Sequence, residues 1–63
     1  MDAKINKKKQ IVVTGILNES LLEMVMGFAQ ESGCTTESQL NGTKMIIDGS
    51  IKQRNDFIKL WNE

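Results

Sequence analysis

The sequence contains no histidine, no proline and no tyrosine, and only one cysteine, Cys34. Histidine is the side chain most often used as a general base and metal ligand near neutral pH, so both uses are missing. A single cysteine cannot form an intrachain disulfide, and a lone thiol among scattered carboxylates does not make a zinc site. The chain also has neither a nucleophile motif nor a glycine-rich phosphate-binding motif. We therefore expect a protein that is not an enzyme, with no cofactor and no small-molecule substrate.

An excess of one charge and long apolar runs are lacking as well. Lys plus Arg and Asp plus Glu both number 8, so the net charge is zero. This balance argues against a strongly basic nucleic-acid binder. No apolar run approaches the ~20 residues of a membrane span, and the first ten residues lack the apolar core of a signal peptide. Because an unpaired cysteine suits a reducing compartment, we expect a cytoplasmic protein with no membrane partner.

The length of 63 residues indicates a single domain. A domain of this size buries only about 60% of its unfolded surface, so its stability is marginal. Small domains usually gain stability from disulfides, a metal or association with another chain. Since the first two are not expected here, we predict self-association, most simply a homodimer, or binding to another protein.

The longest periodic apolar segment runs from Asn18 to Gly33 and predicts a helix. Either Asn18 or Ser20 can cap its N-terminus, and Ser20 with Glu23 fits a capping box. Gly33 can adopt the left-handed conformation that ends many helices. This helix is the element around which we expect the domain to be built.

The apolar arc of this helix is wider than a small sheet can cover. On a helical wheel the central residues are flanked by Met24 on one side and Met26 on the other, and the arc covers roughly 200°, against a little over 100° for an ordinary surface helix. The central residues are Leu21, Leu22, Val25, Phe28 and Ala29. The excess must meet a second helix, a second subunit or a partner, and methionine suits adaptable contact surfaces.

The segment Ile11–Leu17 predicts a strand with apolar residues on both faces, Val12 among them. Residues 1–9 before it are polar and basic, and we expect them to form a flexible arm. Its lysines are candidate phosphate-binding residues, or they belong to a solvated tail. These lysines are Lys4, Lys7, Lys8 and Lys9.

Asn41-Gly42 predicts a type I′ hairpin between Thr35–Leu40 and Thr43–Asp48. Counting outward from a two-residue turn places Ser38 opposite Met45. The first strand of this hairpin is polar on both sides, which suits a sheet edge.

The last segment, from Ile51 to about Trp61, predicts a second helix, with Ser50 and Gln53 in the pattern of a capping box. Arg54 falls on the same broad face as Trp61. Both residue types are enriched at binding hot spots, so we treat them as candidate contact residues. Alternatively, the stem of Arg54 lies on apolar surface while its charged group reaches water.

The predicted order is β-α-β-β-α in one α+β domain over residues 10–63, with the third strand between the other two and both helices on one face. The topology resembles a ferredoxin-like split β-α-β unit that lacks its fourth strand. The first strand would then be an apolar edge, able to pair through Val12 and its neighbours with another chain. If this strand is instead central, it has no free edge and the reason to expect pairing with another chain no longer holds.

These features favour a small protein-interaction module, a regulator or inhibitor of the antitoxin kind that binds and masks a partner protein. Its predicted partner-binding residues are Met24, Met26, Arg54, Trp61 and Val12. Domains of this kind are frequent in phage and mobile elements, so we expect such an origin. The alternative is a nucleic-acid-binding regulator that uses the basic N-terminal arm and the second helix; the absence of aromatic residues from the strands disfavours base stacking.

Overall fold

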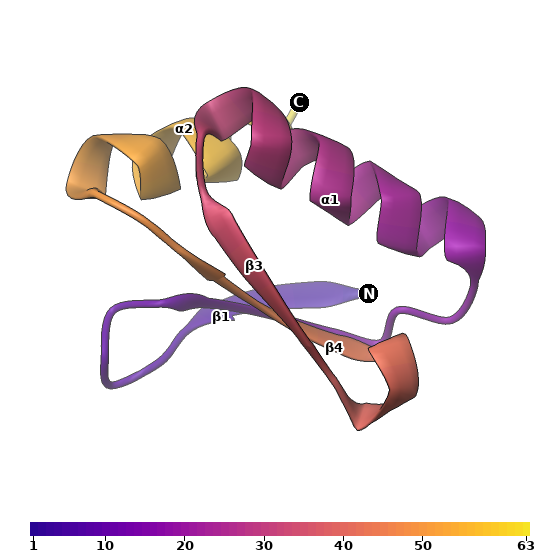
Figure 1. Ribbon diagram of the computed structural model, residues 1–63. Helices are drawn as coiled ribbons and strands as arrows, with labels where there is room; N and C mark the ends of the chain where they lie inside the picture. The colour runs from indigo at the N-terminus through magenta and orange to yellow at the C-terminus, as the bar shows by residue number, and fades with distance from the viewer.

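The computed structural model describes all residues from 1 to 63. Its elements in chain order are β1 (Asp2–Ile5), β2 (Ile11–Thr14), α1 (Glu19–Ser32), β3 (Thr35–Gln39), a 3-10 turn (Leu40–Gly42), β4 (Lys44–Asp48) and α2 (Ile51–Trp61). The strands form one antiparallel sheet in the order β1-β2-β4-β3. Both helices lie on one face of this sheet and leave the other face uncovered (Figure 1). The predicted class, a small α+β domain, is confirmed.

The sheet has four strands, and the prediction of three was wrong. The additional strand, β1, lies within the segment expected to be an arm, and it pairs with β2 so that Ala3 is opposite Val13. Ala3 packs against the core, whereas Lys4 is exposed. Asp2 and Lys4 concealed the strand because they lie on the sheet face that no helix covers, where charged side chains are tolerated, and the other charges of the segment lie in the loop after β1.

The strand expected at an edge, β2, lies between β1 and β4. Both of its backbone edges are therefore hydrogen-bonded within the chain, so the expected pairing of this strand with another chain does not fit the structure. The strand ends at Thr14, before the predicted Leu17. Gly15 follows it with a φ of 73°, a left-handed conformation that breaks the strand.

The other three strands keep the predicted relative order, with β4 between β2 and β3. The hairpin register is also confirmed, since Ser38 lies opposite Met45. Asn41 and Gly42 have φ values of 55° and 86°, the positive values that a type I′ turn requires. Leu40 is left-handed too, at 52°, which is uncommon for a bulky residue.

The predicted helix ends are confirmed where local capping governs them. The Asn18 side chain accepts a hydrogen bond from the Leu21 N–H at 2.9 Å, and Gly33 ends α1 with a φ of 77°. Ser50 and Gln53 form the reciprocal capping box of α2. Of the two candidate caps of α1, Asn18 is the one used, and Ser20 lies inside the helix.

The core lies between the sheet and the helices. Its fully covered side chains are Ile11, Val13, Ile16, Val25, Ala29, Met45, Ile47 and Phe57. Phe57 of α2 meets Phe28 of α1 edge-on, with the ring centroids 6.4 Å apart, and stacks on Trp61 at 6.2 Å. The contact between Phe28 and Phe57 joins the two helices above the sheet, whereas the Phe57–Trp61 stack lies within α2.

Candidate protein-binding surface

The two methionines that flank the apolar arc of α1 remain exposed after the fold has formed. Val25 and Ala29 are buried, and Phe28 packs against α2. By contrast, Met24 and Met26 keep 39% and 48% of their surface accessible. The second helix therefore covers the centre of the arc but neither of its flanks.

Beyond its first turn, the exposed side of α1, which we name the α1 crest, consists of Glu23, Met24, Met26, Gly27, Gln30 and Glu31. The two methionines lie on opposite shoulders of the crest, about 160° apart around the helix at 100° per residue. Gly27 lies between them, and its neighbours three or four positions away are the other crest residues apart from Met26. Three polar side chains and Met24 therefore surround a position that has no side chain, and Met26 lies at the far side of the crest.

Gly27 has no role within the chain that requires glycine. It does not have a positive φ, and a Cβ atom built there would meet nothing within 4 Å. A glycine inside a helix is about 1 kcal/mol less favourable than alanine. This cost is therefore incurred in the isolated protein without a compensating contact.

The α1 crest carries negative charge only. No lysine or arginine occurs from Gln10 to Thr43, a span with four glutamates, Glu19, Glu23, Glu31 and Glu37. The one ion pair in the chain joins Lys4 and Asp2 at 3.8 Å, so the carboxylates of α1 have no cationic partner within the protein. A surface of this kind attracts a positively charged ligand.

Arg54 and Trp61 lie away from the α1 crest and have contacts inside the chain. The Arg54 guanidinium donates hydrogen bonds to the carbonyl oxygens of Ser50 and Lys9, which ties α2 to the β1–β2 loop. Trp61 is half-buried and stacks on Phe57. These contacts place both residues in the packing of α2.

Val12 lies on the uncovered face of the sheet, in a row that continues through Lys4 on one side and Ile46 and Glu37 on the other. Val12 and Ile46 are both half-buried, and the row ends in charges of opposite sign. The predicted partner-binding residues are thus on three elements: Met24 and Met26 on α1, Arg54 and Trp61 on α2, and Val12 on the sheet.

Three of the four candidate phosphate-binding lysines, Lys7, Lys8 and Lys9, lie in the β1–β2 loop. The Asn6 carboxamide oxygen orders this loop by accepting hydrogen bonds from the N–H groups of Lys8 at 3.0 Å and Gln10 at 2.9 Å. The fourth, Lys4, lies on the sheet face beside Asp2. The loop is a compact basic projection below the N-terminal end of α2 (Figure 1).

Asp48, at the end of β4, connects the β1–β2 loop to the sheet through Gln10. Its carboxylate accepts hydrogen bonds from the Gln10 side chain at 3.0 Å and from the Gly49 N–H at 2.8 Å. These two hydrogen bonds, with a smaller contribution from the positive charge of Arg54, hold the pKa of Asp48 below its ordinary value of 3.8. The charged form of Asp48 is therefore favoured by folding.

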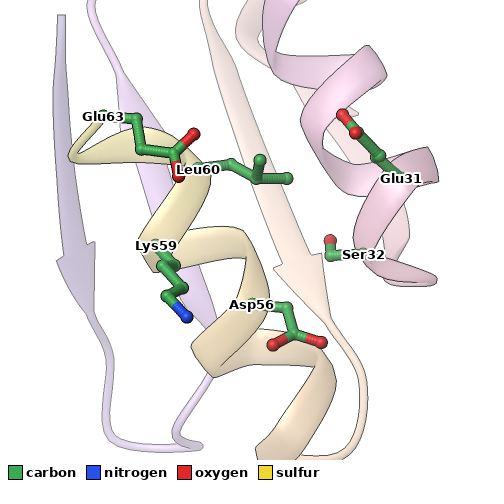
Figure 2. Close-up of a pocket in the computed structure, with 6 residues that line it drawn as sticks. All are labelled: Glu31, Ser32, Asp56, Lys59, Leu60 and Glu63. Atoms are coloured by element: carbon green, nitrogen blue, oxygen red, sulfur yellow. The ribbon is translucent and has the colours of Figure 1, made fainter.

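The surface has two shallow hollows, and the first of them borders the α1 crest at Glu31. The first, about 230 Å³, lies between the helices, where Leu60 points across the gap toward α1 (Figure 2). Its other lining residues are Glu31, Ser32, Asp56, Lys59 and Glu63. The second, about 220 Å³, lies between the β2–α1 loop and the β3–β4 turn, near the exposed side chains of Leu17 and Leu40.

On the helical wheel Gly27 falls outside the apolar arc, but the sequence interpretation gave it no role, and it assigned Leu17 and Leu40 to strands. A glycine within a helical pattern signals an unusual requirement at that position, so Gly27 was recognisable in principle. The exposure of Leu17 and Leu40 was not recognisable, because each directly follows an apolar or alternating strand pattern.

No family model, curated protein or solved structure matches this chain. Neither helix combines the length and the apolar composition needed to cross a membrane. The geometry and charge of the α1 crest are therefore the features that indicate a functional surface.

Proposed function

We propose that this protein is a non-enzymatic interaction module that binds another protein through the α1 crest and masks the surface it covers. The observation that carries the proposal is the exposure of Met24 and Met26 on either side of Gly27 after α2 has packed against α1. Methionine side chains adapt their shape to a partner, and they are enriched at interface cores relative to the remaining surface.

Binding fits this surface better than catalysis does. The crest is the outer side of one helix, and its polar groups are exposed carboxylates and one carboxamide. Such a convex surface buries area against a partner but does not enclose a small substrate. A regulator that acts by occlusion needs only this property.

We propose a different protein as the partner, in preference to a homodimer. Symmetric pairing of two α1 crests would bring Glu23 and Glu31 of one copy against the same carboxylates of the other. Like charges brought together at an interface cost several kcal/mol. Pairing through β2, the dimer contact expected from the sequence, is not open, because β2 is paired with β1 and β4.

The test is an affinity capture with immobilised protein and a matched double variant, Met24→Gln with Met26→Gln. Glutamine keeps the length and neutrality of methionine but removes the apolar surface. We expect a partner from the source cell that the wild type retains, that free wild type elutes, and that the double variant retains at least about tenfold less. Equal retention by the folded variant would refute the use of the crest.

A nucleic-acid-binding function is the second candidate, and the observation that favours it is the ordered loop holding Lys7, Lys8 and Lys9. Phosphate binding by these lysines would weaken steeply between low and moderate salt. A triple variant with glutamine at all three positions would lose binding to a single-stranded oligonucleotide. The same variant leaves the α1 crest unchanged, so the two functions are separable.

A further inference from the structure

We infer that the partner segment seated on the α1 crest is a positively charged amphipathic helix that crosses α1 at Gly27. This inference rests on the proposed function and specifies the chemistry of its partner. Three features support it: the position of Gly27, the carboxylates of Glu23 and Glu31, and the side-chain ridges of α1.

Gly27 provides the point of closest approach. Packed helices lie about 8–10 Å apart, and the distance at the crossing point depends on the side chains found there. Without a Cβ atom at Gly27, an apolar side chain of a second helix can reach the α1 backbone while Met24 and Met26 close around it. The isolated protein has room for a Cβ atom at Gly27, with nothing within 4 Å of it, so a contact in the complex explains why the residue is glycine.

The charges on both sides of the crossing point specify the sign of the partner. Glu23 and Glu31 lie four residues before and four residues after Gly27, so a carboxylate flanks the crossing point one turn away on each side. Neither forms an ion pair within the chain. Lysine or arginine residues that flank an apolar stripe would meet both carboxylates, whereas an acidic helix would be repelled.

The backbone of α1 argues for a helix rather than a strand as the occupant. A bound strand gains its affinity from unpaired backbone groups at a sheet edge, and the middle of a helix has none. The free edges that this fold offers to a strand are β1 and β3, at the two sides of the sheet and away from the α1 crest. The α1 crest instead presents side-chain ridges, which a second helix can interleave.

The probe is a fluorescent peptide of about 20 residues, with leucine at the core positions of a heptad repeat and lysine elsewhere, compared with the same peptide carrying glutamate in place of lysine. We expect the lysine peptide to bind the full chain, with an affinity that falls about tenfold from ~50 to ~300 mM salt, and the glutamate peptide to remain unbound. Equal binding of the two peptides would overturn the inference.

The decisive variant is Gly27→Ala. A methyl group at this position should raise the melting temperature by about 4 °C, because alanine favours the helix. The same methyl group should weaken binding of the lysine peptide by about tenfold, because it occupies the crossing point. Asn55→Ala on the exposed side of α2 is the matched control, since it raises helix propensity without touching the crest.

The outcomes separate the inference from the proposed function. If Gly27→Ala and the wild type bind the lysine peptide equally, the close approach at Gly27 is wrong, while the double methionine variant still decides whether the crest binds proteins. If the lysine peptide fails to bind and a single-stranded oligonucleotide binds instead, the basic helical partner is wrong and the β1–β2 loop becomes the site.

Discussion

At the scale of single residues, the two glycines of α1 illustrate opposite requirements. Gly33 has a φ of 77°, and a Cβ there would lie 3.0 Å from the Gln53 carboxamide nitrogen. We predict that Gly33→Ala destabilises the fold by about 1 kcal/mol or more, whereas Gly27→Ala stabilises it by about 0.5–1 kcal/mol. Urea denaturation of both variants tests this, and a loss of stability in Gly27→Ala would contradict the account of the crest.

Asp48 predicts a dependence of stability on pH. Its pKa is lowered in the folded protein, so its contribution is fully present above the ordinary value of 3.8 and is lost as pH falls through the lower folded value. We expect Asp48→Asn to be less stable than the wild type near neutral pH, with the difference shrinking below pH 3.8. Urea midpoints from about pH 2 to about pH 7 measure this difference. A constant difference across that range would show that the charge is unimportant.

Phe57 is the largest side chain that the fold covers completely. Truncating a buried phenylalanine to alanine costs about 3–5 kcal/mol, and a domain this small has only about 5–10 kcal/mol of stability. We predict that Phe57→Ala unfolds part of the population at room temperature. Near-ultraviolet circular dichroism from Trp61, which stacks on Phe57, detects the loss, and Phe57→Leu should retain more of the signal.

At the scale of elements, the β1–β2 hairpin depends on the side chain of Asn6. This side chain accepts hydrogen bonds from two backbone N–H groups, those of Lys8 and Gln10, and it also donates one to the Gln10 side chain. We predict that Asn6→Ala increases hydrogen exchange at these two amides by about tenfold, with little change in α1. Exchange measured residue by residue by NMR tests this, with Lys7→Ala as the control that keeps the loop bonds.

The elements differ in how far local sequence predicts them. The ends of α1 and α2 follow from Asn18, Gly33 and the Ser50–Gln53 box, because a cap acts on the helix turn next to it. The β3–β4 register follows from Asn41-Gly42 for the same reason. Strand β1 was not predicted, because its four residues become a strand only through pairing with β2, and pairing depends on distant residues.

At the scale of the whole molecule, zero net charge conceals a separation of charge. The β1–β2 hairpin is basic, while the span from Gln10 to Thr43 carries four carboxylates and no cation. Opposite charges on different surfaces allow one small protein to attract different ligands to different sides. The two candidate functions therefore occupy different surfaces, which is why single variants can distinguish them.

Self-association is the property that tests the molecule as a unit. Because β2 is internal and the α1 crest carries like charges, we predict a monomer in sedimentation equilibrium at both ~50 and ~300 mM salt. The variant Glu23→Gln with Glu31→Gln removes the repulsion, so any pairing between crests should appear there first. A wild-type dimer at both salt concentrations would contradict the preference for a different partner protein.

Local sequence is enough to predict the two helices, the β3–β4 hairpin and the α+β class, because capping, turn chemistry and periodicity act over a few residues. It also placed Met24 and Met26 at the limits of an apolar arc that is wider than the fold needs. Only the tertiary structure decided that β2 is internal, that Arg54 and Trp61 are used in packing, and that Gly27 lies uncovered between the methionines. These outcomes depend on which surfaces meet, and that is set by the free energy of the whole assembled chain rather than by neighbouring residues.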